Sequence, residues 1–310
     1  MSLIKPRALK PGDKVGIIAP ASNIKRELLE EGIAGLRQLG YEPIYLPGIL
    51  ERELYFAGSL DRRLRELEEM LERDDIAAII CARGGYGANY LLERLDFEKF
   101  AQHPKIICGY SDITTLLTAI TDRAGLITFH GPMVTKDFAS ADGVDLSSWN
   151  SGVSGATTWD VSTDGVEVLR EGRAQGSLYG GCLSLLAASL GTPFEIQTDE
   201  TILFIEDLAA KPYQVDRMLM QLRLAGKFDQ VRGLIFGEMM DCVQPSGQDY
   251  TLQRVIMRVL GSYDVPTIYG LRSGHVSRAN ITLPLGVQAK LIASGSGAKL
   301  TVLEPSVQVS

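Results

Sequence analysis

The first 135 residues alternate short apolar runs with longer segments in which apolar residues recur every three or four positions. Short continuous apolar runs are typical of strands buried on both faces of a parallel sheet, and the longer spacing indicates amphipathic helices. Because the two patterns alternate, residues 1–135 are predicted to form a doubly wound parallel α/β domain. Its strands are expected at 14–19, 43–46, 76–82, 106–108 and 126–129, and its helices at 24–39, 60–72, near 91–92 and from 113 onward.

One strand-to-helix connection in this half is unusually short. Only four residues separate the apolar run 106–108 from the helical periodicity that begins at Ile113. So abrupt a turn lifts Ser111 above the carboxyl edge of the sheet and places its hydroxyl at a helix N-terminus, where free N–H groups can face developing negative charge. This is the geometry of a nucleophile elbow, although the sequence is Gly-x-Ser-x-x rather than Gly-x-Ser-x-Gly. The alternative is that Ser111 or Asp112 simply caps the helix.

Other loops are expected at the same edge of the sheet. Residues 20–22, 83–87 and 130–131 each follow a predicted strand, as Ser111 does. Ligand sites in parallel sheets lie at the carboxyl ends of the strands. The candidate elbow therefore has neighbouring loops that can complete a site.

The pattern changes after residue 135. Between 136 and 172 it fades into Ser, Asp and Gly, which is typical of an interdomain connection with a few short strands or turns. Residues 173–310 are then predicted to form a second, mixed domain that is richer in β-structure. Helices are expected at 180–190, 212–222 and 252–260, and strands at 202–205, 234–236, 267–269, 281–285, 290–293 and 299–303.

Composition and charge argue against several classes of protein. A formal net charge of -7 at pH 7 argues against a nucleic-acid binder. We expect no secretory signal at the N-terminus, and the longest apolar stretch, around 183–190, is too short to span a membrane. The four cysteines lack C-x-x-C spacing and are expected to be buried small hydrophobes in a reducing cytoplasm. Without H-E-x-x-H or a comparable ligand cluster, neither a metal nor another cofactor is expected.

A serine nucleophile needs a base, because its hydroxyl is nearly un-ionised at neutral pH. The chain has three histidines. His103 lies at the amino end of the elbow strand, which is the wrong end. His130 lies on the correct edge, but in a turn where its ring could equally bond backbone groups. His275 lies in a polar loop of the second domain, and such loops often carry function. The local pattern leaves His130 and His275 as candidates.

A histidine base is oriented by an acceptor, usually a carboxylate. Glu206 ends the apolar run Thr-Ile-Leu-Phe-Ile, so its carboxylate is expected to be partly buried and to need a partner. The alternative is that it caps the following segment. Glu238 also follows an apolar strand, Leu-Ile-Phe-Gly, and the sequence alone does not rank the two.

Acyl transfer also needs hydrogen-bond donors for the oxyanion. Elbow geometry offers the backbone N–H of Asp112, directly after Ser111. The glycine turn 83–87 follows another strand of the same sheet and can bring a second N–H close, that of Gly85. The alternative is a phosphate-binding glycine turn, which is a weaker interpretation because the G-x-G-x-x-G and Walker spacings are incomplete.

Six short motifs occur in order along the chain, between Lys14 and about Leu303. They are Arg83-Gly84-Gly85-Tyr86-Gly87-Ala88, Gly109-Tyr110-Ser111-Asp112, His130-Gly131-Pro132-Met133, Gly180-Gly181-Cys182-Leu183-Ser184-Leu185, Leu203-Phe204-Ile205-Glu206-Asp207 and Gly274-His275. Together they resemble the LD-carboxypeptidase family of serine peptidases, which includes muramoyltetrapeptide carboxypeptidases and the microcin C immunity peptidases. One departure is Cys182, which stands where a small polar residue such as Asn is expected.

The resemblance implies a Ser–Glu–His triad on Ser111, Glu206 and His275. It thus favours Glu206 over Glu238 and His275 over His130. It also implies an N-terminal parallel α/β domain joined to a smaller β-rich domain, a site in the cleft between them, and a homodimer. The implied substrate is a small peptide with a bond between an L-centre and a terminal D-residue, as in the release of D-alanine from murein tetrapeptide during cytoplasmic cell-wall recycling.

A carboxypeptidase must also recognise a free carboxylate. Arg83, beside the glycine turn, can make a bidentate pair with one. The alternative is that Arg83 pairs with an acidic residue of the protein.

Two rival functions remain at this point. The first is hydrolysis of peptidyl-nucleotides of the microcin C type by the same fold. The second is a non-catalytic or amidotransferase-like binding domain, although an amidotransferase of this sheet type would need a cysteine at the position of Ser111.

Overall fold

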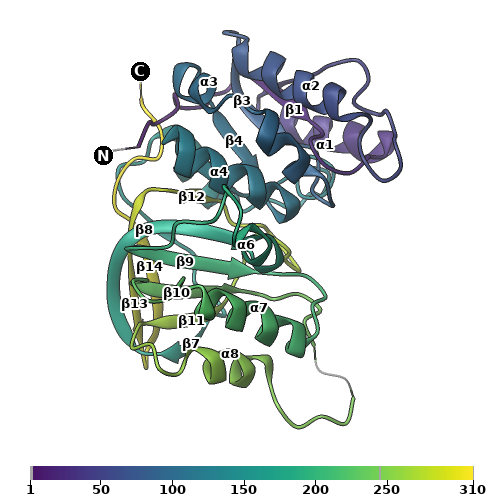
Figure 1. Cartoon of the computed structure of the whole chain (residues 1–310). Coiled ribbons are helices and arrows are strands. Elements are labelled where there is room, and N and C mark those ends of the chain that lie inside the picture. The colour runs from purple at the N-terminus through teal and green to yellow at the C-terminus, as the bar shows by residue number, and fades with distance from the viewer. Residues whose placement is uncertain (1–2, 244–245, 310) are drawn as a thin grey trace.

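The computed structural model describes residues 3–243 and 246–309, and their strands form two sheets (Figure 1). The first sheet has the strand order β12-β5-β4-β3-β1-β2. Strands β1 to β5 are parallel, and β12 joins the edge antiparallel to β5. Their bounds are Lys14–Ile18 (β1), Glu42–Tyr45 (β2), Ile76–Cys81 (β3), Ile106–Gly109 (β4), Thr128–His130 (β5) and Leu283–Leu285 (β12).

Helices cover both faces of this sheet, because alternate residues of each strand point to opposite faces. Ile17 of β1 packs in the same core cluster as Leu29 of α1, whereas its neighbour Ile18 packs with Leu67 of α2 and Leu116 of α4. The helices are α1 (Arg26–Gln38), α2 (Leu60–Glu72), α3 (Phe97–Gln102) and α4 (Thr114–Ala124), with the 3₁₀ helices η1 (Ala88–Arg94) and η2 (Ser111–Ile113).

The second sheet has the strand order β6-β14-β13-β8-β9-β10-β11-β7. Strands β8 to β11 are parallel, and the strands on either side of them are antiparallel. Figure 1 shows α7 and α8 side by side, and both pack in one core cluster with strands of this sheet. The strands are Trp159–Val161 (β6), Glu167–Arg170 (β7), Gly172–Cys182 (β8), Thr201–Glu206 (β9), Gly233–Gly237 (β10), Thr267–Leu271 (β11), Gln288–Ser294 (β13) and Gly297–Val302 (β14), and the helices are α5 (Leu146–Ser154), α6 (Leu183–Ser189), α7 (Pro212–Leu224) and α8 (Leu252–Leu260).

The predicted fold class is confirmed: a parallel, doubly wound sheet is joined to a second, β-rich unit. The predicted limits of the units, 1–135, 136–172 and 173–310, stay a prediction. The stretch 136–172 contains α5 and also β6 and β7, which belong to the second sheet. In the part of the chain that the structure describes, no helix is long and apolar enough to cross a bilayer.

Helices α3 and α5 and most of strand β8 were not predicted, and two predicted elements differ in extent or pairing. The helix expected over 180–190 begins only at Leu183, because Gly180 and Gly181 complete strand β8. A Cβ on Gly180 would lie 2.0 Å from the carbonyl oxygen of Phe204 on β9, so the glycines permit a close approach of two strands. The strand expected at 281–285 is shorter, and as β12 it extends the first sheet, pairing Leu283 with His130.

The two sheets meet where α4 begins. The backbone N–H of Cys182, at the end of β8, donates to Oγ1 of Thr114 at 3.0 Å. A Cβ on Gly181 would lie 2.6 Å from the same oxygen, so no larger residue fits between strand and helix. Cys182 also pairs in register with Glu206 of β9. The start of α4, three residues after Ser111, therefore lies one strand away from Glu206.

Candidate active site

Ser111 occupies a strained turn between β4 and α4. Its φ angle is +63°, in the left-handed region that residues other than glycine seldom adopt. Such a conformation costs on the order of 1–2 kcal/mol and tends to persist where a functional group must be presented. The elbow interpretation therefore describes the backbone well. Neither η2 nor α4 has a side-chain cap at its start, so the simple capping alternative for Ser111 and Asp112 is wrong.

The glycine turn after β3 packs directly against Ser111. A Cβ on Gly84 would lie 2.7 Å from Cβ and 3.0 Å from Oγ of Ser111, and 3.1 Å from the backbone nitrogen of Asp112. Gly85 has a φ of +105°, and a Cβ there would collide with Ser22 Oγ at 2.4 Å. The backbone of this turn therefore borders the serine as closely as sterics allow. The oxyanion role of the Gly85 and Asp112 N–H groups stays a prediction.

The side chain of Asp112 ties the elbow to the glycine turn. Its carboxylate is buried and accepts a hydrogen bond from the Ala88 backbone N–H at 2.7 Å. Burial raises the pKa of this carboxyl, while that hydrogen bond and the charge of Arg63 oppose the rise. Asp112 thus fixes the position of the loop 83–88 relative to Ser111.

Glu206 and His275 are in direct contact. Oε2 of Glu206 accepts hydrogen bonds from the His275 backbone N–H at 3.0 Å and from its Nδ1 at 2.8 Å. Glycines make room for the carboxylate on two sides: a Cβ on Gly274 would lie 2.6 Å from Glu206 Cδ, and one on Gly237 2.7 Å from Glu206 Cβ. With Nδ1–H bound to the carboxylate, Nε2 of a neutral His275 carries the lone pair and can accept a proton.

The Glu206 carboxylate is ionised although it is fully buried. Burial alone would raise its pKa, but interactions with His130 and His275 outweigh this and lower the pKa to about 2. The carboxylate is therefore charged at every pH at which a histidine base could work. His275 is less enclosed, with 13% of its side chain exposed.

The serine loop and the histidine loop touch through Tyr110. The ring of this buried residue, directly before Ser111, meets the His275 ring edge-on, with centroids 5.2 Å apart and planes at 87°. Aromatic pairs prefer such arrangements. The structure thus brings the loop that follows β4 of the first sheet to the loop that follows β11 of the second.

The rival residues lie elsewhere or face other partners. Glu238 accepts hydrogen bonds from the backbone N–H and hydroxyl of Ser277 at 2.8 and 3.0 Å, and so faces that loop instead of the His275 ring. His103 follows α3 at the amino end of β4, away from the elbow. His130 is fully buried and lies on the opposite side of Glu206 from His275.

Arg83 is exposed at the rim of the site. Its guanidinium makes one long hydrogen bond, 3.3 Å, to the carbonyl oxygen of Asn23. Among residues 3–243 and 246–309, no carboxylate lies within ion-pair distance of it, so the alternative of a structural acidic partner is not seen there. Over the same residues, no group of three or more His, Cys, Asp or Glu side chains could hold a metal ion.

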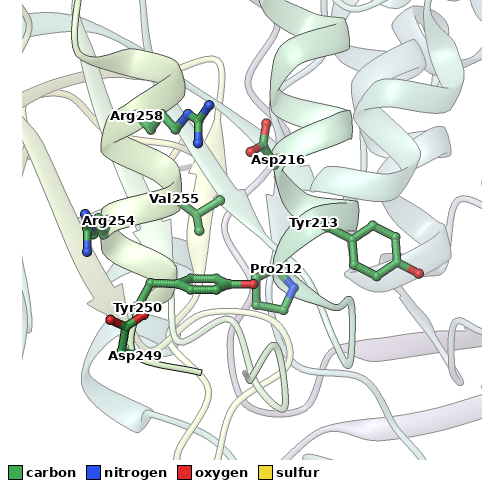
Figure 2. A pocket seen from close by; sticks show the side chains of 8 residues that line it. All are labelled: Pro212, Tyr213, Asp216, Asp249, Tyr250, Arg254, Val255 and Arg258. Carbon is green, nitrogen blue, oxygen red and sulfur yellow. The ribbon is translucent and has the colours of Figure 1, made fainter. Parts of the chain in front are cut away.

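Two hollows flank the second sheet's helices. One, of about 650 Å³, lies between the two halves of the chain and is lined by Tyr86 and Tyr90, by Thr115 on α4 and by Phe194 after α6. Thr115 follows Ser111 by four residues, but none of the candidate site residues lines this hollow. The other, of about 750 Å³, lies between α7 and α8, where Asp216 and Arg258 point toward each other (Figure 2). None of the candidate site residues lines that second hollow.

Comparison with known proteins decides the family. The LD-carboxypeptidase N-terminal domain model matches residues 15–131, and the C-terminal domain model matches residues 175–291. A probable murein peptide carboxypeptidase from Bacillus subtilis is 38% identical over 307 residues, covering 98% of this chain and 95% of its own. This chain belongs to the LD-carboxypeptidase family. It is therefore a serine-type LD-carboxypeptidase, as the six motifs predicted.

Two further relatives show how wide the family is. The solved structure of muramoyltetrapeptide carboxypeptidase from Oxalobacter formigenes has a TM-score of 0.83 and 30% identity, covering 93% of this chain and 98% of its own. The microcin C7 self-immunity protein MccF from Escherichia coli is 28% identical over 329 residues, covering 94% of each chain. The LD-carboxypeptidase fold thus carries proteins with more than one named role.

Replacing Gly84 with alanine is expected to lower kcat at least about 100-fold, since displacing a reacting group by 1 Å can have that effect. The new Cβ would lie 2.7 Å from Cβ of Ser111, so the serine must shift. Gly152→Ala is the matched control, because a Cβ there has its nearest neighbour at 3.7 Å. Steady-state kinetics compare the two variants with the wild type, and equal thermal unfolding midpoints show that all three proteins are equally folded. Full activity of the Gly84 variant would mean that the turn does not position Ser111.

Asp137, in the loop after β5, is expected to make stability depend on pH. It is buried, Oδ2 accepts from the Met133 N–H at 2.8 Å, and burial raises the pKa of its carboxyl from 3.8 to about 6. Because the pKa is higher in the folded protein, the stabilisation is complete below pH 3.8 and is lost as the pH rises through about 6.

The Asp137→Asn variant keeps an oxygen acceptor for Met133 and removes the titration. Between pH 4 and 8, titration of Asp137 should lower the wild type's free energy of unfolding, measured with urea, by up to about 3 kcal/mol. The variant should not show this decrease. Asp142→Asn, at an exposed position in the same loop, is the control and should keep the wild-type slope. Equal slopes in all three proteins would contradict the assignment.

Proposed function

We propose that this protein is a serine carboxypeptidase that hydrolyses the L,D-peptide bond of murein tetrapeptide and releases the terminal D-alanine. The observation that carries the proposal is the hydrogen bond between Glu206 and His275, formed beside the strained turn that presents Ser111. The names of the B. subtilis and O. formigenes relatives support murein peptides as the substrate class.

In the proposed reaction, Ser111 Oγ attacks the scissile carbonyl carbon while His275 Nε2 takes its proton. Glu206, hydrogen-bonded to Nδ1, fixes the tautomer and stabilises the imidazolium. The C–N bond then breaks, His275 gives the proton to the amine of the departing D-alanine, and an ester to Ser111 remains. Water activated by His275 hydrolyses that ester and restores the serine.

The N–H groups of Asp112 and Gly85 are proposed to stabilise the oxyanion. The close packing of the glycine turn on Ser111 supports this assignment. In comparable sites, removal of one such donor costs about 3 kcal/mol of transition-state stabilisation. Arg83 is proposed to bind the substrate carboxylate, and its exposed guanidinium without a carboxylate partner among the described residues supports that role.

We further propose that the enzyme works in the cytoplasm, in peptidoglycan recycling, as a homodimer. The four cysteines support a reducing compartment, since all four are buried and free. The recycling role and the dimer rest on the resemblance to the family. Sedimentation analysis of the purified protein tests the dimer, which a single monomeric species would contradict.

The test of the main proposal is incubation with murein tetrapeptide, followed by mass spectrometry of the products. Wild-type enzyme should remove one alanine, with or without EDTA, and Ser111→Ala should not. Tetrapeptide that ends in L-alanine is the matched substrate control and should stay intact. Turnover by the Ser111 variant, or no turnover by the wild type, would contradict the proposal.

The likeness to MccF favours a second candidate, hydrolysis of a peptidyl-nucleotide of the microcin C type. The same assay distinguishes the two when such a conjugate is offered in a parallel reaction. Release of the nucleotide part, without cleavage of murein tetrapeptide, would make this second candidate the function.

A further inference from the structure

His130 has a place beside the triad that the proposed reaction does not use. It ends β5, is fully buried, and its Nε2 faces Oε1 of Glu206 at 3.8 Å. Within residues 3–243 and 246–309, neither of these two atoms has a hydrogen-bond partner. Glu206 thus lies between two histidines, with Oε2 bound to His275 and Oε1 turned toward His130.

The hydrogen bonds of Ser273 fix the proton on the other ring nitrogen of His130. The Ser273 hydroxyl donates to the carbonyl oxygen of Ile281 at 2.8 Å. Its single proton is therefore engaged, and its contact with His130 Nδ1 at 2.9 Å requires that Nδ1 be the donor. A neutral His130 would consequently turn a bare Nε2 lone pair toward the Glu206 carboxylate in a site closed to water.

The charge of Glu206 makes that neutral form unfavourable. A nitrogen lone pair that faces a carboxylate oxygen is repulsive, and a buried charge is costly unless it is paired. His275 cannot supply the pairing charge, because it must be neutral in the resting enzyme if it is to take a proton from Ser111. The groups around the His130 ring are Phe204, with centroids 5.0 Å apart, and Tyr110, at 6.0 Å. Neither is cationic.

The remaining charged or titratable groups of the neighbourhood do not supply the charge either. The other titratable groups that interact with Glu206, namely Tyr110, Cys182, Asp207 and Cys242, are all acids. The ammonium group of Lys136 lies over the ring of Tyr110, 5.5 Å from its centroid. A second proton on His130 would balance the carboxylate. At 3.8 Å the contact is too long for a hydrogen bond, so the interaction acts through charge.

We propose that His130 is a positioning residue of the triad: it is doubly protonated, and its imidazolium holds Oε1 of Glu206 so that Oε2 stays on His275. The protonation of His130 does not depend on the proposed function. Only the expected effect on catalysis rests on it. Because Nε2 is buried against the carboxylate, His130 itself does not touch the substrate.

The protonation is tested on the intact wild-type protein by ¹⁵N NMR of the histidine side chains at pH 7.5. His130→Gln and His103→Gln assign two of the three rings. Protonation of both His130 nitrogens, unchanged in Ser111→Ala, is the expected result and does not depend on any activity. A His130 ring with one protonated nitrogen would overturn the proposal.

The positioning role is tested by kinetics of His130→Asn, which keeps a donor for Ser273 and loses Nε2. We expect kcat to fall about 10- to 100-fold, which is the loss typical when the outer partner of a metal-bound histidine is removed. KM should stay within about twofold of the wild type. The acid limb of the kcat/KM profile should move to higher pH, because His275 is protonated more easily without a neighbouring cation. His103→Gln is the control. An unchanged kcat and pH profile in a folded His130→Asn protein would overturn the role.

Discussion

Replacing Ser111 with alanine is expected to lower kcat by at least about 10⁴-fold on murein tetrapeptide, because no group remains to form the acyl-enzyme. The fold should persist, since alanine tolerates the positive φ of this position no worse than serine does. Substrate should still bind, so KM should change little. Quenched reactions with mass spectrometry of free D-alanine measure the residual rate.

Ser154→Ala is the matched control for this experiment. Ser154 is exposed at the end of α5, and its replacement should leave kcat unchanged. A Ser111→Ala enzyme that retains a tenth or more of wild-type activity, after trace contamination is excluded, would show that the elbow serine is not the nucleophile.

Replacing Glu206 with glutamine should lower kcat by about 10³- to 10⁴-fold, the loss expected when a buried orienting carboxylate becomes an amide. The amide can still accept from His275 Nδ1, but it no longer stabilises the imidazolium that forms when Ser111 is deprotonated. The loss should therefore appear in kcat, and the thermal unfolding midpoint should fall as well, because the proposed His130 imidazolium loses its buried counter-charge. Stopped assays and thermal unfolding measure the two quantities.

Glu238→Gln separates this role from a general effect of losing a carboxylate. Glu238 follows the neighbouring strand β10 and is bound to Ser277, so its variant should keep kcat within about threefold of the wild type, as replacements away from a site do. Equal losses in the two variants, or a larger loss for Glu238, would contradict the assignment of Glu206.

Much of the fold could be predicted because buried parallel strands leave continuous apolar runs. All six residues of β3, Ile76–Cys81, are buried, as that run predicted. Long-range pairing leaves no such trace. The pairing of β12 with β5 joins residues more than 150 positions apart, and the extension of β8 through Gly180 depends on the approach of β9. An apolar run next to two glycines is equally typical of a helix.

For the site, local spacing was informative about Ser111 and uninformative about its partners. The four-residue connection between β4 and the helix could only be made by an abrupt turn. Glu206 and Glu238 both follow apolar strands, and which of them faces His275 depends on how the loop after β11 folds back. The family resemblance, and not the pattern, favoured Glu206. The position of His130 behind Glu206 was missed, although its motif stood out.

Ser111 from one sheet and His275 from the other are expected to act as one catalytic unit. The most direct measurement is a double-mutant cycle on kcat with Ser111→Ala, His275→Ala and the combined variant. We predict that the double variant has the same residual rate as the more impaired single variant, because either change alone disables the unit. Losses that multiply, so that the double variant falls by the product of the two single effects, would contradict it.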